Sequence, residues 1–377
     1  SKGREMLSHR GQAGVVLSAL IAALMVGLAP SGVAQAGPGN QASRVAVITG
    51  AQSINDTEAR DEIKGTDLGI MWTDERGQIL AAFGDTFGGG WTGPGSEAAD
   101  PAATDWRSNT LARSHDRNPA DGMAFSGFVT DHPGHAKELI PSLKRDGVEI
   151  TTIPTGGINV GGRNYLAYMS VRHFGQPGQW TTNYSGIAYS DDDGQTWVDA
   201  PSARQPNTPS FDDKYQMIAY ARRDGFVYAF GTPNGHFGDA HLARVPEQRL
   251  LDKSAYEYWT GKSWQRGASA VAAPIVAGPV GEMSVRYDQT LNSWEMMYLD
   301  EALGAIVVRL APAPTGPWGT PIPVATSSQY PSLYGGFLNP DSNGSDIYFT
   351  MSQYDRYNVS MMHATLPANT VNNRQAP

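Results

Sequence analysis

Short apolar runs separated by polar, glycine-containing turns follow one another along most of this chain. The first clear pair, Leu68–Trp72 and Ile79–Phe83, flanks the polar segment Thr73–Gly77. Two such runs around a short turn predict a β-hairpin. Asp67 precedes the first run and Asp85 follows the second. Residues equally distant from a turn lie opposite one another in an antiparallel pair, so both carboxylates are expected at the same end of the hairpin.

A similar unit recurs along the rest of the chain. Each unit reads as a strand, a turn, a second strand and a third strand, and a Gly-x-Trp or Gly-x-x-Trp sequence closes three of them. Including the opening hairpin, there are five units of roughly 50–70 residues, at the long end of propeller blade periods. Amphipathic stripes at helical spacing are scarce. We therefore predict an all-β fold, specifically a five-bladed β-propeller with long loops.

The ends of the repeat region predict how the ring closes. The segment Arg44–Thr49 alternates like a strand, and we expect it to pair with the last unit, which would remove an exposed sheet edge. No Pro/Ser tract or charge block interrupts residues 37–367, so we expect a single propeller domain there. Residues 368–377 are expected to form a flexible tail.

Residues 1–36 have the features of a signal peptide. The segment starts with three basic residues, continues with a nearly all-apolar stretch from Ala13 to Pro30, and ends in the small-residue site Ala34-Gln35-Ala36. An uncleaved membrane anchor is the alternative, but the apolar stretch is short for a membrane span. We therefore expect a secreted or cell-envelope protein that has no membrane association after cleavage.

The charge of the chain narrows the class of partner. The formal net charge is −9, and because the leader contributes +2 the exported part carries −11. Such an acidic body with few basic clusters argues against nucleic acid or an anionic membrane as partner. It fits a neutral substrate such as an uncharged sugar polymer.

Metal and cofactor chemistry has little support in the sequence. There is no cysteine, which removes thiol catalysis and cysteine-ligated metals. Histidines at H-x-x-x-H spacing are absent, and His132 and His135 lie close together in a Pro/Gly loop where we expect them to face solvent. Gly157, Gly161 and Gly162 do not form a dinucleotide-binding fingerprint. We therefore predict no metal and no cofactor.

Asp67 and Asp85 are the best candidates for catalysis. Two acids held together at an open strand end, among aromatic residues such as Trp72, Phe87 and Trp91, suit general acid/base work on a glycosidic bond. Aspartates are also common at strand ends because their side chains bond to turn backbone, so a structural role is the alternative.

Several loop residues are candidates for substrate binding. Aromatic rings stack on sugar C–H faces, while amides, guanidinium groups and carboxylates bond to hydroxyl groups. Loops also hold many residues of these types that have no ligand. The candidates are Trp106, Arg107, Asn109, His173, Glu282 and Tyr334.

The segment Ser190–Trp197 matches the S-x-D-x-G-x-x-W pattern called the Asp box in sialidase-like propellers. We expect a tight turn in which Ser and Asp side chains bond backbone amides while the Trp packs between blades. This role is structural and supports the propeller prediction.

Longer stretches of the sequence resemble a known family. The runs KGTDLGIMW, FGDTFGGGW and WRSNTLARS, followed by NYSGIAYSDDDGQTW and GEMSVRYDQTLNSWEMMYLDE, are similar to those of the domain-of-unknown-function 4185 family. The resemblance extends from about Arg44 to Leu366. Members have been reclassified as glycoside hydrolase family 183, endo-acting D-arabinofuranosidases with a five-bladed propeller fold. They cut the α-linked D-arabinan of mycobacterial arabinogalactan and lipoarabinomannan.

The resemblance implies that Asp67 and Asp85 are the paired catalytic aspartates, but it does not say which is the acid and which the base. The family is taken to invert the anomeric centre. Directly opposed strand residues have Cβ atoms about 4.5–5.5 Å apart, whereas inversion needs carboxyl groups roughly 6.5–9.5 Å apart, so retention stays open. A non-catalytic glycan-binding propeller and an exo-acting or sialidase-like hydrolase are the two competing functions.

Overall fold

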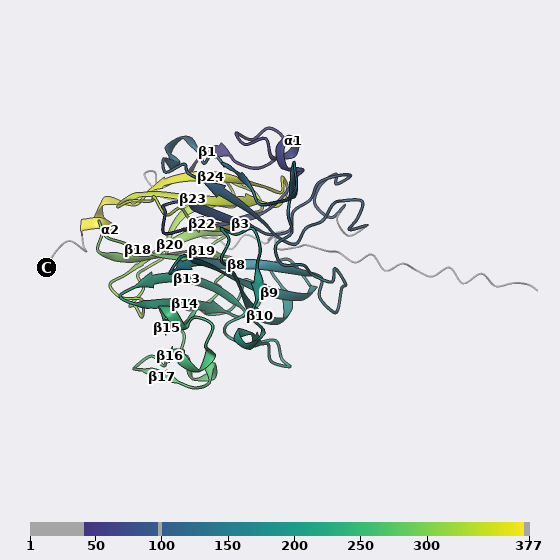
Figure 1. The fold of residues 1–377 in the computed structure, drawn as a ribbon. Coiled ribbons are helices and arrows are strands. Elements are labelled where there is room, and N and C mark those ends of the chain that lie inside the picture. Colours follow the sequence, from purple (N-terminus) through teal and green to yellow (C-terminus); the bar gives the residue numbers. More distant parts are fainter. Residues whose placement is uncertain (1–40, 97–99, 373–377) are drawn as a thin grey trace, which may run out of the picture.

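The computed structural model describes residues 41–96 and 100–372, and its regular structure is almost entirely β (Figure 1). The prediction of an all-β fold is confirmed. The predicted signal peptide lies outside the described residues. Within them, no helix combines the length and apolar character that crossing a membrane would need.

The described residues form five antiparallel sheets of four or five strands and one separate two-stranded pair. The first sheet includes the predicted opening hairpin, and the second follows it in the chain. The first sheet consists of β2 (Leu68–Thr73), β3 (Ile79–Phe83), β4 (Thr110–Ser114) and β5 (Gly127–Phe128). The second consists of β8 (Thr151–Val160), β9 (Arg163–Phe174), β10 (Trp180–Ser190), β11 (Val198–Asp199) and β12 (Gln205–Pro206). The separate pair is β6 (Thr130–His132) and β7 (His135–Ala136).

The remaining three sheets follow in chain order. The third consists of β13 (Met217–Arg223), β14 (Phe226–Thr232), β15 (His241–Pro246), β16 (Glu257–Trp259) and β17 (Trp264–Arg266). The fourth consists of β18 (Met283–Asp288), β19 (Ser293–Asp300), β20 (Ala305–Ala311) and β21 (Ile322–Thr326). The fifth combines β22 (Leu333–Leu338), β23 (Asp346–Gln353) and β24 (Asn358–Thr365) with β1 (Ser43–Val47) from the start of the described chain.

The helical segments are short connections. Two are α-helical, and the others are single 3₁₀ turns between strands. The predicted tail begins as one of these helices, α2. The segments are α1 (Thr57–Asp61), η2 (Pro119–Asp121), η3 (Pro201–Ala203), η4 (Glu247–Arg249), η5 (Lys253–Ala255), η6 (Ser269–Val271) and α2 (Ala368–Asn372).

The first strand of each sheet packs against the first strand of the next, and the order is cyclic. Strand β2 contacts β8, β8 contacts β13, β13 contacts β18, β18 contacts β22, and β22 contacts β2 again. In Figure 1, β16 and β17, which are the last two strands of the third sheet, lie at the periphery, away from β22 and β19. We call β2, β8, β13, β18 and β22 the inner strands. Their ends bound the sites described below.

The predicted pairing of the N-terminal strand with the last unit is confirmed. Strand β1 is antiparallel to β24, with Ser43 opposite His363 and Val47 opposite Ser360. The guanidinium of Arg44 reinforces the pair by donating to Ser360 Oγ at 3.1 Å. Strand β1 thus covers the edge of β24 and is itself the outermost strand of the fifth sheet.

The Asp box has the predicted structural role. Ser190 Oγ accepts from the Gly194 N–H at 2.9 Å, and Asp192 Oδ1 accepts from the Thr196 N–H at 2.8 Å. The Trp197 indole donates to the Gly194 carbonyl at 2.8 Å. On the neighbouring sheet, Arg113 of β4 donates to the Asp193 carbonyl. The turn thus ties the second sheet to the first.

Candidate active site

The opening hairpin holds Asp67 and Asp85 at one end, but not directly opposite one another. The register runs from Thr73 opposite Ile79 to Leu68 opposite Phe83, with a bulge between Leu68 and Ile70. One additional residue in β2 moves Asp67 opposite Gly84, whose N–H donates to the Asp67 carbonyl at 3.0 Å. The predicted direct opposition of the two aspartates is therefore wrong, because the simple count did not include a bulge.

Asp67 lies in a closed environment that favours its protonated form. The side chain is fully buried and lies over Gly84, where an added Cβ would stand 2.4 Å from Oδ1. Oδ2 accepts from the Tyr334 hydroxyl at 2.8 Å, whereas Oδ1 has no hydrogen-bond partner among the described residues. Burial raises the pKa of Asp67 well above its usual range, and the charges of Asp85 and Glu282 raise it further.

Asp85 is also fully buried, but donors surround it. Its Oδ1 accepts from the Trp106 indole at 2.7 Å and from the Thr151 hydroxyl at 2.5 Å. The Tyr357 hydroxyl donates to the Asp85 backbone carbonyl at 2.9 Å. An oxygen that accepts two hydrogen bonds suits an ionised carboxylate. The two aspartates thus have environments of opposite kinds.

A third carboxylate belongs to the same region. Glu282 directly precedes β18, and its Oε1 lies 2.8 Å from Nε2 of the fully buried His236. Glu301 Oε1 lies 2.8 Å from the other ring nitrogen. Burial lowers the pKa of His236, but the charges and hydrogen bonds of both glutamates outweigh it and raise that pKa to about 10. His236 is therefore an imidazolium at neutral pH, and it holds Glu282 Oε1 in place.

Two of the predicted substrate contacts have structural roles instead. Arg107 is buried and its guanidinium donates to the backbone carbonyls of Glu62 at 2.6 Å and Ala136 at 3.2 Å. The Asn109 amide donates to the carbonyls of Ile140 and Thr152 and accepts from two backbone N–H groups. These groups are satisfied within the protein, so neither is placed to bond a sugar hydroxyl.

The other candidates divide into two groups. Trp106, Tyr334 and Glu282 lie with the two aspartates through the contacts given above. His173 is exposed on β9, where its Nδ1 lies 2.7 Å from Asp146 Oδ1. Thr151, Tyr357 and His236 were not predicted, because no local sequence pattern marks a residue whose partner lies on a distant sheet.

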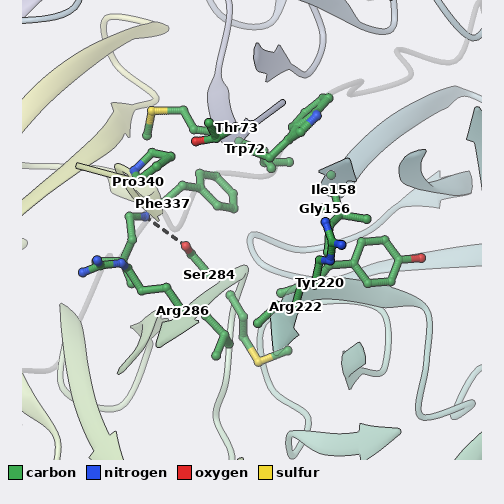
Figure 2. A pocket seen from close by; sticks show the side chains of 18 of the residues that line it. Trp72, Thr73, Gly156, Ile158, Tyr220, Arg222, Ser284, Arg286, Phe337 and Pro340 are labelled. Atoms are coloured by element: carbon green, nitrogen blue, oxygen red, sulfur yellow. Dashed lines mark hydrogen bonds between the residues drawn. The ribbon is translucent and has the colours of Figure 1, made fainter. Parts of the chain in front are cut away.

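A large cavity lies toward the opposite end of the inner strands. Asp67, Thr151 and Glu282 stand at or just before the first residues of β2, β8 and β18. The cavity, of about 420 Å³, is lined mostly by residues farther along the inner strands. Figure 2 shows it, with residues of all five inner strands around the hollow: Trp72, Thr73, Gly156, Ile158, Tyr220, Arg222, Ser284, Arg286 and Phe337.

A much smaller hollow lies near the acids. It has a volume of about 10 Å³ and is lined by Glu282 together with residues such as Leu68, Pro154 and Met217. The end of the inner strands that holds the carboxylates is therefore nearly closed, and the end without them is open. What the closed end provides is a buried acid, a hydrogen-bonded carboxylate and a third carboxylate paired to an imidazolium. This set can give and take protons at a bond between them.

Comparison with known proteins places the chain in a family. Two fungal proteins are similar over most of their length: Notoamide biosynthesis cluster protein J from Aspergillus sp. (strain MF297-2), 34% identical over 78% of this chain and 80% of that protein, and protein J' from Aspergillus versicolor, 32% identical over 78% and 81%.

Solved structures show the same kind of fold at low identity. A protein from Bacteroides ovatus ATCC 8483, described as a candidate hydrolase, matches with a TM-score of 0.57 and 12% identity, over 85% of this chain and 90% of that one. The α-L-arabinofuranosidase PaAbf62A from Podospora anserina matches with a TM-score of 0.46 and 10% identity, over 88% and 98%.

The family model for the Domain of unknown function (DUF4185) matches residues 52–363, which include both aspartates and all five first strands of the sheets. The chain therefore belongs to the DUF4185 family.

Proposed function

We propose that this protein is an exported endo-acting glycoside hydrolase of family 183, which cleaves α-D-arabinofuranosyl linkages in mycobacterial arabinogalactan and lipoarabinomannan. The observation that carries the proposal is the pair of buried aspartates at one hairpin end: the raised pKa of Asp67 favours a proton there, and Trp106 and Thr151 donate hydrogen bonds to Asp85. Two carboxyl groups with opposed proton affinities are the requirement for acid/base cleavage of a glycosidic bond.

We propose further that the five sheets are the blades of a five-bladed β-propeller. The cyclic contacts of the inner strands and the β1–β24 pairing support this architecture. Inner strands that run in the same direction bring the loops before them to one face. That face would hold Asp67, Thr151 and Glu282, which come from three different sheets.

In this mechanism Asp67 is the general acid and Asp85 the general base. Asp67 would protonate the leaving glycosidic oxygen, for which its raised pKa supplies the proton near neutral pH. Asp85 would remove a proton from water as the water attacks the anomeric carbon, through an oxocarbenium-like transition state. Tyr334 orients Asp67, and Trp106 and Thr151 orient Asp85.

The bulge at Leu68–Gly69 supports inversion over retention. A direct cross-strand pair would bring the Cβ atoms too close to admit a water between the carboxyl groups. The observed register removes that constraint, because Asp67 is opposite Gly84 rather than Asp85. Both carboxylates are fully buried, so the proposal also requires that a bound arabinan chain displace covering groups to reach them.

The test is incubation of the protein with purified mycobacterial arabinogalactan, with products resolved by size and anomeric configuration. A ladder of arabino-oligosaccharides that first appear with inverted configuration is expected, and none from Asp67→Asn or Asp85→Asn. Retained configuration would overturn the inverting mechanism but not the hydrolase.

The competing functions give different products. Monosaccharide released first would identify an exo-acting hydrolase. Retention of the polymer on immobilised protein, without any product, would identify a glycan-binding protein in which both aspartates accept hydrogen bonds from hydroxyls.

A further inference from the structure

The hairpin β6–β7 places two histidines side by side, away from the carboxylate end. His132 and His135 are paired across the hairpin, and their rings stack with centroids 4.6 Å apart and an interplanar angle of 6°. His132 is exposed, whereas His135 is buried. The expectation that both face solvent is therefore wrong for His135.

One carboxylate orients both rings. Asp131 Oδ1 lies 2.9 Å from Nδ1 of His132 and 2.8 Å from Nδ1 of His135. Both imidazoles are thus held through Nδ1, which leaves Nε2 as the nitrogen for a further ligand. A carboxylate that fixes the far nitrogen of an imidazole is the usual outer support of a metal-binding histidine.

A second carboxylate near the two histidines belongs to a distant part of the sequence. Glu62, at the C-terminal end of α1, has Oε2 at 3.8 Å from Nε2 of His135. One ligand atom each from Glu62, His132 and His135 lies within 4.8 Å of the other two. Asp105 joins them, with Oδ2 at 2.9 Å from His135 Nε2.

The charges around the cluster are unbalanced when both imidazoles are neutral. Glu62, Asp105 and Asp131 carry three negative charges, and the cation bonded to the group is Arg107, at 3.2 Å from Asp105. A divalent cation at the convergence of the ligand atoms would offset this excess. Two imidazole nitrogens and one or two carboxylate oxygens form a donor set that suits zinc.

We propose that Glu62, His132 and His135 bind a divalent transition metal, zinc fitting best, and that Asp131 holds both imidazoles in position for it. Glu62 and His132 are exposed, so the ion can enter from solvent. His135 Nε2 would exchange its contact with Asp105 for the ion. The sequence did not predict this site because its third ligand lies 70 positions before His132.

The site would be structural rather than catalytic. Asp105, which contacts His135, directly precedes Trp106, whose indole donates to Asp85. The ion would take the place of this His135–Asp105 contact, outside the active site. The proposal does not depend on which reaction the protein catalyses.

The test is titration of chelator-treated, purified protein with zinc chloride, followed by calorimetry and by thermal unfolding. One equivalent is expected to bind with micromolar or tighter affinity and to raise the midpoint of unfolding. His132→Asn and Glu62→Gln should each weaken binding at least about tenfold. Because both side chains are exposed, both variants should unfold like the parent protein when no zinc is present.

His363→Asn is the matched control, since His363 also pairs with an aspartate, Asp346, at 3.0 Å. It should bind zinc like the parent. Absence of binding, millimolar binding, or binding that His132→Asn and Glu62→Gln leave unchanged would each overturn the proposal.

Discussion

The two ends of the inner strands differ in both shape and charge. At the end where these strands finish there is a cavity of about 420 Å³, and two of the arginines that line it are paired with glutamates. Arg222 binds Glu247 at 2.7 Å, and Arg286 binds Glu295 at 3.0 Å. At the end where they start the hollow is small, and Asp67 forms no ion pair with Lys, Arg or His in the described part of the chain.

This difference teaches that the volume of a hollow is a poor guide to chemistry in this fold. At the large cavity Arg222 and Arg286 are paired with glutamates, and the one of these glutamates whose proton affinity is raised is Glu295, because burial raises its pKa to about 7. At the carboxylate end, burial raises the pKa of Asp67 well above its usual range, and the nearby charges of Asp85 and Glu282 raise it further. The predictions below test the two ends against one another.

The largest predicted difference in kcat is between a variant at Asp67 and a variant at Arg222. Asp67→Asn removes the proton donor and should lower kcat about a thousandfold, while Arg222→Gln at the large cavity should change kcat less than about threefold. Initial rates on arabinogalactan, with circular dichroism to confirm folding, make the comparison. Equal losses in the two variants would place the chemistry at the large cavity.

A smaller difference, in the pH dependence of kcat/KM, is predicted between variants at the buried residues Glu282 and Glu295. Glu282→Gln removes a negative charge that raises the pKa of Asp67, so the basic limb of the kcat/KM profile should move to lower pH, and the rate should fall about a hundredfold. Glu295→Gln, on β19 beside Arg286, should leave the limb in place. A limb that moves upward in Glu282→Gln would contradict the assignment of Asp67 as the acid.

Tyr334→Phe should move the same limb in the opposite direction. The Tyr334 hydroxyl lowers the pKa of Asp67 by hydrogen bonding, so its loss raises that pKa further and shifts the basic limb to higher pH. We expect a rate loss of about tenfold from the freed carboxyl. The measurement is the pH dependence of kcat/KM beside that of the parent. An unchanged limb would mean that this bond does not control proton transfer.

The smallest predicted effect near neutral pH is on the free energy of unfolding, to which protonation of His236 contributes. Its pKa is about 10 in the folded protein against an ordinary value of 6.5. The stabilisation from its protonation is therefore complete below about pH 6.5 and is lost as the pH rises towards 10. Urea unfolding across this interval should show a declining free energy for the parent and a flatter profile for His236→Gln. Parallel profiles would refute a charged His236.

The sequence was sufficient for the hairpin and both aspartates because these depend on neighbours in the chain. It was not sufficient for the bulge at Leu68–Gly69, which shifts the register by one residue without any distinctive composition. Arg107 and Asn109 were assigned to the substrate because the groups that bond sugar hydroxyls also bond buried backbone. His236 was missed because its partners, Glu282 and Glu301, lie 46 and 65 positions away.

The pairing of β1 with β24 affects the order in which the protein can fold. Arg44 and Ser360 are 316 positions apart, so the fifth sheet is incomplete until nearly the whole described chain has been synthesised. Pairing between such distant segments is entropically costly and slow. The growing chain therefore keeps this sheet unfinished until β24, the last of its strands, has been synthesised.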